Sequence, residues 1–172
     1  MHDPRPHLGE PLALDLLDTR WNQHGRPQDL LTDVAGLTVW LNSAGLADRT
    51  TADQATLDAL LAARTAIYDV VRSATHIALN EVLDHGRIRR TLTDAGPENV
   101  IDVPDSTWLP AWLAADNLLH LLGEAPDRIR QCAHPDCVLF FYDTSKNGTR
   151  RWHSMATCGN RTKAARHYAK KP

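Results

Sequence analysis

The sequence lacks the features of a membrane protein or of a secreted, disulfide-bonded one. It contains no apolar run long enough to span a bilayer, and its first residues, MHDPRPHLGEP, contain no apolar core for a secretory signal. Only three of the 172 residues are cysteines, an odd number that favours metal-binding thiolates over a disulfide framework. We therefore expect a cytoplasmic protein with no membrane association.

Motifs typical of enzymes are also missing. The chain has no glycine-rich phosphate loop, no nucleophile elbow and no His-Glu-x-x-His pair. His24, His76, His85 and His120 are scattered without a spacing that indicates a catalytic site. The sequence thus favours a protein that is not an enzyme.

Acidic residues are absent from the C-terminal segment. Between Thr144 and Pro172 there are eight Lys or Arg and no Asp or Glu, which leaves 11 basic against 21 acidic residues in the first 143, a charge of about −10. Such segregation favours a separate partner for the tail, with nucleic acid the first candidate. A basic terminus that is merely solvated is the alternative, and composition leaves the two about even.

Apolar periodicity predicts a mainly helical first domain. One helix is expected from a cap at Thr32 or Asp33 to Gly45, and a longer one from a capping box of Thr51 with Gln54, in which Arg64 would keep its charge in water. Residues 87–103 are typical of a β-hairpin, and a further helix follows a cap at Ser106 or Thr107. The N-terminal GEPLALDLLDTRW fits either a buried strand or a short helix.

The last quarter of the chain has a different pattern. The strand-like VLFFYD and the later RRWH flank an Asn147–Gly148 turn, which predicts a second hairpin, and a basic helix should begin near Ser154 or Met155. We expect a mainly α fold with a small β-hairpin element: a helical domain over residues 1–125, and a zinc-bound knuckle–hairpin–helix module over residues 126–172. The module has few apolar side chains, so zinc should supply its folding energy while the first domain stands alone.

The metal-binding pattern is Cys-x4-Cys, fifteen residues, then His-x4-Cys. Zinc takes four soft or borderline ligands in a tetrahedron, and a set without an open position for water is structural. Cys132, Cys137 and Cys158 supply three ligands. His153 is the favoured fourth, because His134 lies too close to Cys132 and His167 lies too far along the last helix.

The segment CAHPDCVLFFYDTSKNGTRRWHSMATCGNR resembles the CGNR zinc finger, whose name is the tetrapeptide at positions 158–161. The family usually has Cys where this chain has His153, so the resemblance implies a site that keeps its metal with one negative charge fewer. The preceding part is similar to the ABATE domain, described as a stress-induced transcription regulator. That resemblance rests on the residues at 9–15, on Asp18-Thr19, where the family generally has Asn before the Thr, and on weaker matches around Trp40 and Arg64.

Two functions follow from these observations. In the first, the chain is a DNA-binding transcription regulator whose helical domain senses a signal or forms a homodimer. The residues expected to contact phosphates are Arg150, Arg151, Arg161, Lys163, Arg166 and Lys170. Some of these arginines could instead brace the finger, Arg161 above all. In the second, the finger is a structural cap of a protein-interaction module, and its basic groups would be buried or paired.

Overall fold

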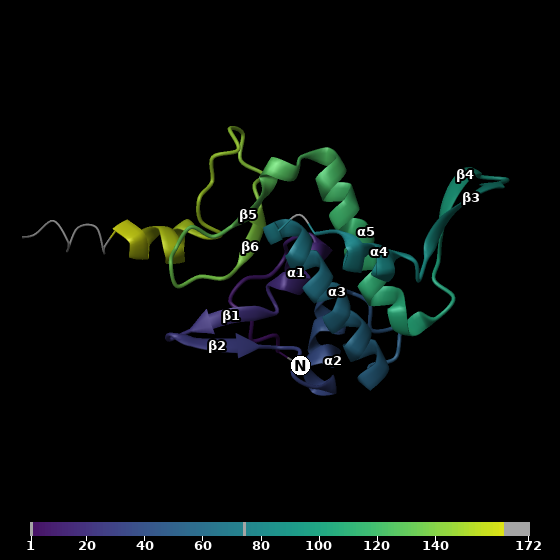
Figure 1. Cartoon of the computed structure of the whole chain (residues 1–172), viewed down its shortest axis with the longest axis horizontal. Coiled ribbons are helices and arrows are strands. Elements are labelled where there is room, and N and C mark those ends of the chain that lie inside the picture. The colour runs from purple at the N-terminus through teal and green to yellow at the C-terminus, as the bar shows by residue number, and fades with distance from the viewer. Residues whose placement is uncertain (1, 74, 164–172) are drawn as a thin grey trace, which may run out of the picture.

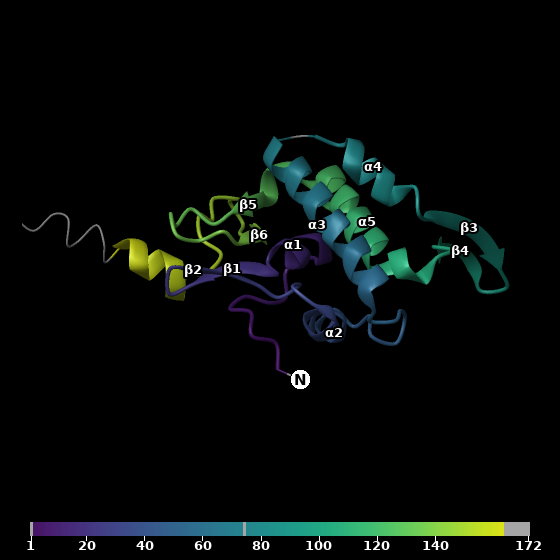
Figure 2. The ribbon, with the colours of Figure 1, turned by 60° about the horizontal axis from the view of Figure 1, so that its bottom comes forward.

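The computed structural model describes residues 2–73 and 75–163, which form an elongated molecule with a helical body at its centre (Figure 1). Helices α1 (Leu12–Leu17), α3 (Gln54–Ser73) and α5 (Leu109–Glu124) pack against one another, with α2 (Val34–Ser43) and α4 (Ile77–Leu83) on either side. In Figure 2, α3 and α5 run side by side through the body. The prediction of a mainly α fold with a small β-hairpin element is confirmed, since the described residues are mainly helical with small antiparallel sheets.

Aspartate side chains cap the N-termini of α2 and α3. Asp33 caps α2 by accepting a hydrogen bond from the Gly36 N–H at 2.8 Å. Of the two caps expected from the sequence, Thr32 and Asp33, the structure thus has Asp33. The chain leaves α2 through Gly45, whose φ of +69° suits glycine. The capping box at Thr51 is wrong: the side chain of Asp53 accepts from the Thr56 N–H, which places the cap two residues later. The ambiguous N-terminal segment is the helix α1.

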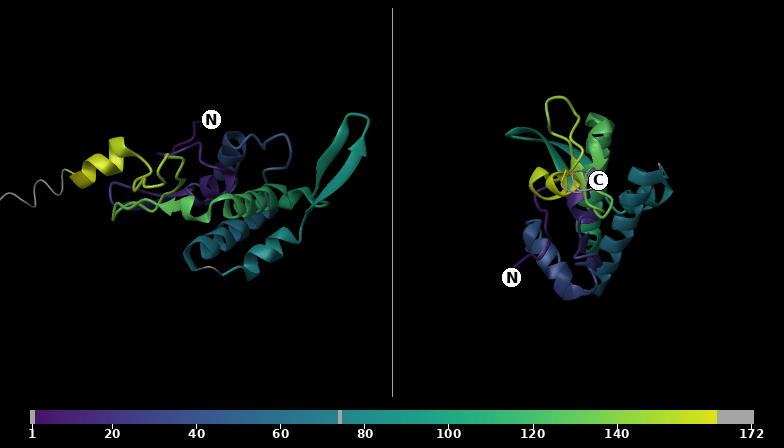
Figure 3. Two further views of the ribbon diagram at one scale, coloured as in Figure 1. Left: turned by 90° about the horizontal axis from the view of Figure 1, so that it is seen from above. Right: turned by 90° about the vertical axis from the view of Figure 1, so that its left-hand side faces the viewer.

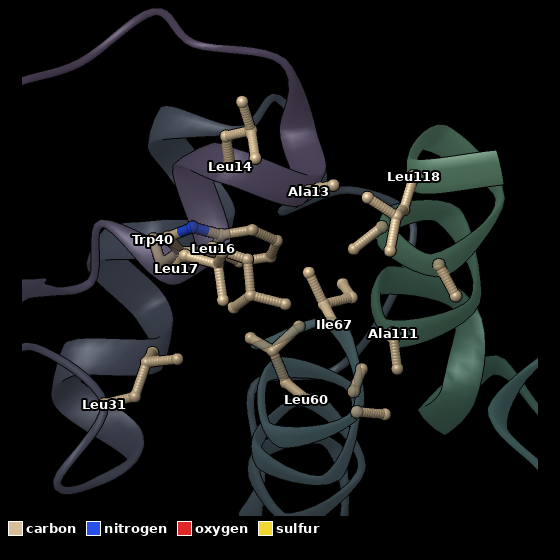
Figure 4. Packing of buried hydrophobic residues seen from close by; sticks show 14 of the residues in the cluster. Ala13, Leu14, Leu16, Leu17, Leu31, Trp40, Leu60, Ile67, Ala111 and Leu118 are labelled. Carbon is tan, nitrogen blue, oxygen red and sulfur yellow. The ribbon is translucent and has the colours of Figure 1, made fainter. Parts of the chain in front are cut away.

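A single hydrophobic cluster occupies the centre of the body. Leu14 and Leu16 of α1 meet Trp40 of α2, Leu60 of α3 and Leu118 of α5, and all five are fully buried (Figure 4). Two residues of the C-terminal segment, Leu139 and Phe140, belong to the same cluster and are 3% and 4% exposed. The C-terminal segment therefore packs on the core of the helical body.

The described residues form three antiparallel two-stranded sheets: β1 (Arg20–Gln23) with β2 (Arg26–Asp29), β3 (Arg87–Thr93) with β4 (Gly96–Asp102), and β5 (Ile129–Gln131) with β6 (Phe140–Tyr142). The β3–β4 hairpin is the one predicted between residues 87 and 103. It projects from one end of the molecule, opposite the C-terminal helix (Figure 3).

The second predicted hairpin forms differently. Its aromatic strand β6 pairs with β5, which precedes it in the chain, and not with the Arg-Arg-Trp-His segment that follows. Asp143 explains the difference: its Oδ1 accepts from the Ser145 N–H and its Oδ2 from the Arg150 N–H, at 2.9 Å each. These bonds close residues 143–150 into a loop, within which Gly148 adopts a φ of +61°.

Arg64 is buried, so its expected position with the charge in water is also wrong. Its guanidinium donates to both carboxylate oxygens of Asp29, at 2.7 and 2.8 Å, and to the hydroxyl of Thr19 at 2.8 Å. Burial disfavours ionisation of Asp29, but hydrogen bonds from Arg64 and Arg20 outweigh it, so its pKa lies below the usual 3.8. The apolar stripe of α3 accommodates the charge of Arg64 because Asp29 of β2 forms an ion pair with it.

Candidate metal centre

The four predicted ligands lie together. Cys132 and Cys137 come from the loop that joins β5 to β6, His153 precedes the C-terminal helix, and Cys158 lies within it. One donor atom from each of the four lies within 4.8 Å of the others. The Cys137 Sγ and His153 Nδ1 are 3.5 Å apart, close to the roughly 3.6 Å expected between a thiolate and an imidazole in a tetrahedral zinc site.

Local hydrogen bonds hold the first pair of cysteines. The Cys132 N–H donates to the Leu139 carbonyl at 2.9 Å, and the Cys137 N–H donates to the His134 carbonyl at 3.0 Å. The ring of His134 accepts from the Asp136 N–H, so this histidine closes the loop and lies outside the four-residue cluster. Its position agrees with its exclusion from the predicted ligand set.

The C-terminal helix contains the ligand Cys158 in its first turns. It begins at η3 (Met155–Gly159), continues to residue 163, and is capped by Ser154, whose hydroxyl accepts from the Thr157 N–H. A Cβ at Gly159 would lie 2.5 Å from the sulfur of Met155, so the flexible side chain of Met155 packs directly over this glycine. The cluster is largely closed to water: Cys132, His153 and Cys158 are 6%, 6% and 2% exposed.

The charge of the thiols indicates that a cation fits here. A hydrogen bond from Cys137 lowers the pKa of Cys132 to about 3, so one thiolate is favoured without any metal. The pKa of Cys137 is raised, first by its hydrogen bond to Cys132, and burial raises that of Cys158. A divalent cation would relieve the repulsion that opposes further thiolates, and three sulfurs with one imidazole are a donor set that zinc prefers.

Contacts with the helical body surround the cluster. The Phe140 N–H donates to Asp18 Oδ1 and the Tyr142 N–H to Glu10 Oε2, both at 2.8 Å. Asn22 donates to the Asp136 carbonyl at 2.9 Å. Sequence reasoning missed these roles, although a carboxylate such as Asp18 next to an apolar helical run is a signal that a buried partner exists.

The basic residues of the tail divide into two groups. Arg150 is directed inward: it donates to the carbonyls of Trp152 and His153, and its guanidinium lies 4.6 Å from the centre of the Phe141 ring. Arg151, Arg161 and Lys163 are exposed, with Arg151 over the ring of Trp152. Arg166 and Lys170 lie outside the described residues.

Two arginines that sequence reasoning did not single out also brace the finger. Arg128 donates to the carbonyls of Asp143 and Ser145, and Arg130 donates to that of Gly148. Arg128, Arg130 and Arg150 brace the finger, whereas Arg161, for which bracing was the alternative to a phosphate contact, is exposed at the surface.

Comparison with known proteins agrees with this geometry. Residues 128–171 match the family model of the CGNR zinc finger, and residues 10–125 match ABATE, described as a "putative stress-induced transcription regulator". The chain belongs to the ABATE family and carries a CGNR zinc finger. Zinc is accordingly the cofactor of its Cys/His cluster. A search of curated proteins finds no match.

The matched families comprise regulators and zinc fingers, not enzymes. Among the described residues, no helix is both long and apolar enough to cross a membrane.

Proposed function

We propose that the chain is a DNA-binding transcription regulator, in which Cys132, Cys137, His153 and Cys158 bind one structural zinc ion. The four ligands leave no position for a substrate or water, so the zinc would fix the shape of the finger and take no part in catalysis. The family description supports regulation of transcription, and the charge of the finger supports DNA as the partner.

The observation that carries the DNA assignment is the exposure of Arg151, Arg161 and Lys163. A structural cap would bury or pair such groups, whereas a DNA-binding surface leaves them available for phosphates. Each of the three is exposed, and the part of the chain that the structure describes forms no ion pair with any of them. The helix that carries Arg161 and Lys163 projects away from the acidic body (Figure 3).

Salt-dependent binding tests this proposal. The zinc-loaded full-length chain should bind a fluorescent duplex with log affinity falling linearly in log salt, because each neutralised phosphate releases counterions and contributes about −0.9 to the slope. Replacing Arg151 and Lys163 together with Gln should reduce the slope by up to about two units without changing the zinc content. The measurement is fluorescence anisotropy at several salt concentrations.

A matched control removes the same charge elsewhere. Arg49 and Arg89 are exposed residues outside the finger, and replacing both with Gln should leave the slope unchanged. If both double variants reduced the salt slope equally, a specific role of the finger in DNA binding would be contradicted. Absence of any salt-dependent binding at low ionic strength would leave the protein-interaction function in its place.

One observation favours a protein partner as a second candidate, either a second copy of the chain or another protein. On one face of the projecting β3–β4 hairpin, Ile88, Leu92 and Ile101 are 47%, 83% and 40% exposed. Isolated two-stranded hairpins are marginally stable in water, so burial of this face in an interface would stabilise it. Light scattering should show a homodimer that Leu92→Glu dissociates; a monomeric wild type would exclude self-association through the hairpin.

A further inference from the structure

A cavity of about 560 Å³ lies between the helical body and the finger, away from the zinc ligands. Its walls come from β1 and β2, from α3, and from the β5–β6 segment of the finger, in which Gln131, Val138 and Phe140 line it. This volume is typical of cavities that enclose small organic molecules, and such cavities occur preferentially where two modules meet.

Six of the fourteen residues that line the cavity are aromatic or aliphatic, and the other eight are polar or charged. Tyr68 of α3 meets Phe140 of β6 edge to face, with ring centroids 6.1 Å apart and an interplanar angle of 85°. Trp21 and Leu17 form further apolar parts of the wall. Although it belongs to the hydrophobic side of α3, Tyr68 is 44% exposed, and Val138 is 38% exposed. The exposed surface of these two residues would be covered by a planar apolar ligand.

The charged groups of the cavity leave an excess of one positive charge. Arg20, Arg64 and Asp29 all line it. Asp29 is neutralised by Arg64, which binds both of its oxygens, and Arg20 adds a second guanidinium through its Nε at 3.0 Å. The side chain of Arg20 is 63% exposed, and among the described residues its two terminal nitrogens donate to no protein group.

We propose that this cavity is a binding site for a small aromatic monocarboxylate, whose ring lies against Tyr68 and Phe140 and whose carboxylate meets the terminal nitrogens of Arg20. One uncompensated guanidinium matches one carboxylate by charge and by fork geometry. A phosphate with two negative charges would exceed the single net positive charge of the lining. Because the wall includes residues of both modules, the bound acid would contact the finger and the body at once. The site goes beyond the proposed function and does not depend on it.

Calorimetric titration of the zinc-loaded full-length chain with 2-naphthoate tests the site, with the neutral 2-naphthamide as a ligand of the same shape. We expect saturable binding of one naphthoate per chain and binding of the amide weaker by about tenfold or more, since charged hydrogen bonds are the strong ones. Arg20→Gln should weaken naphthoate binding by a similar factor, so that the variant binds the acid and the amide with similar affinity. Arg26→Gln, an exposed arginine of the same hairpin that does not line the cavity, should bind naphthoate as the wild type does.

A second variant blocks the cavity without touching its charge. Thr65 lines the cavity from an exposed position of α3, so Thr65→Trp should fill the space and abolish binding of both ligands. Thermal melting of each variant checks that it is folded. Absence of saturable naphthoate binding overturns the proposal, and so does binding that Thr65→Trp or Arg20→Gln leaves unchanged. DNA is absent from the experiment, so its result is separate from that of the proposed function.

Discussion

Replacing Asp18 with Asn should stabilise the protein at neutral pH. The carboxylate of Asp18 is 1% exposed, and while its Oδ1 accepts from the Phe140 N–H, its Oδ2 has no hydrogen-bond partner among the described residues. An amide keeps the acceptor for Phe140 and removes the buried charge. Its N–H group would also face the negative surroundings that Glu10 and Asp15 create. An unsatisfied buried group costs about 1–3 kcal/mol, and we expect a gain within that range.

The gain should depend on pH in a defined direction. Burial raises the pKa of Asp18 well above 3.8, and the carboxylates of Glu10 and Asp15 raise it further, against the opposing hydrogen bond from Phe140. The unfolded chain releases the proton near 3.8, whereas the folded chain retains it to higher pH. The wild type therefore loses stability as the pH rises from 3.8 through the folded pKa, and the asparagine variant does not.

Urea unfolding of both proteins, zinc-loaded, at a series of pH values measures this difference. The advantage of Asp18→Asn should be small in acid, grow as the pH rises, and then level off. Asp33→Asn is the matched control: it makes the same charge change at an exposed helix cap, where Asp and Asn are equally good, so it should show no such growth. A variant less stable than the wild type at pH 8, or a gain that does not change with pH, would refute the reasoning.

Two further outcomes concern the metal. Chelation should lower the melting temperature of the whole chain in one transition, because Phe140 of the finger belongs to the common core. Far-UV circular dichroism of the helices and protease sensitivity of the finger should both report this transition. Loss of finger structure with the helical melting unchanged would show that the two parts are independent. His153→Cys should retain about one zinc per chain by elemental analysis, and His153→Ala should bind zinc more weakly in competition with a chelator. Equal zinc affinities of His153→Ala and the wild type would remove His153 from the ligand set.

Local signals in the sequence predicted most of the helices and the residues of the metal cluster. Apolar spacing gave α2, α3 and α5 because each buries one face, and the cysteine spacing indicated the cluster because a tetrahedral site restricts how two short ligand pairs can meet. The β3–β4 hairpin was likewise predicted from turn residues between two strand-like runs.

The errors had two causes: a partner distant in sequence, and local bonds between side chains and the backbone. Arg64 looked like a solvated charge because its partner, Asp29, is 35 positions away on a different element. The partner strand of β6 was misplaced because Asn147–Gly148 is a good hairpin signal, whereas Asp143 binds the backbone at both ends of that segment and forms a loop instead. Side-chain bonds to the backbone of this kind compete with strand pairing and cannot be read from periodicity.

Strand β6 joins the finger to the body. Its N–H groups at Phe140 and Tyr142 bind carboxylates of the N-terminal segment, and its Phe140 side chain joins the hydrophobic cluster. Undocking would forfeit both bonds, each worth about 0.5–1.5 kcal/mol net of rehydration, as well as the burial of Phe140. The acids Asp18 and Glu10 thus hold the backbone of β6, and the basic side chains of the finger point elsewhere. The acidic body can bind the finger tightly in this way without neutralising Arg151, Arg161 and Lys163.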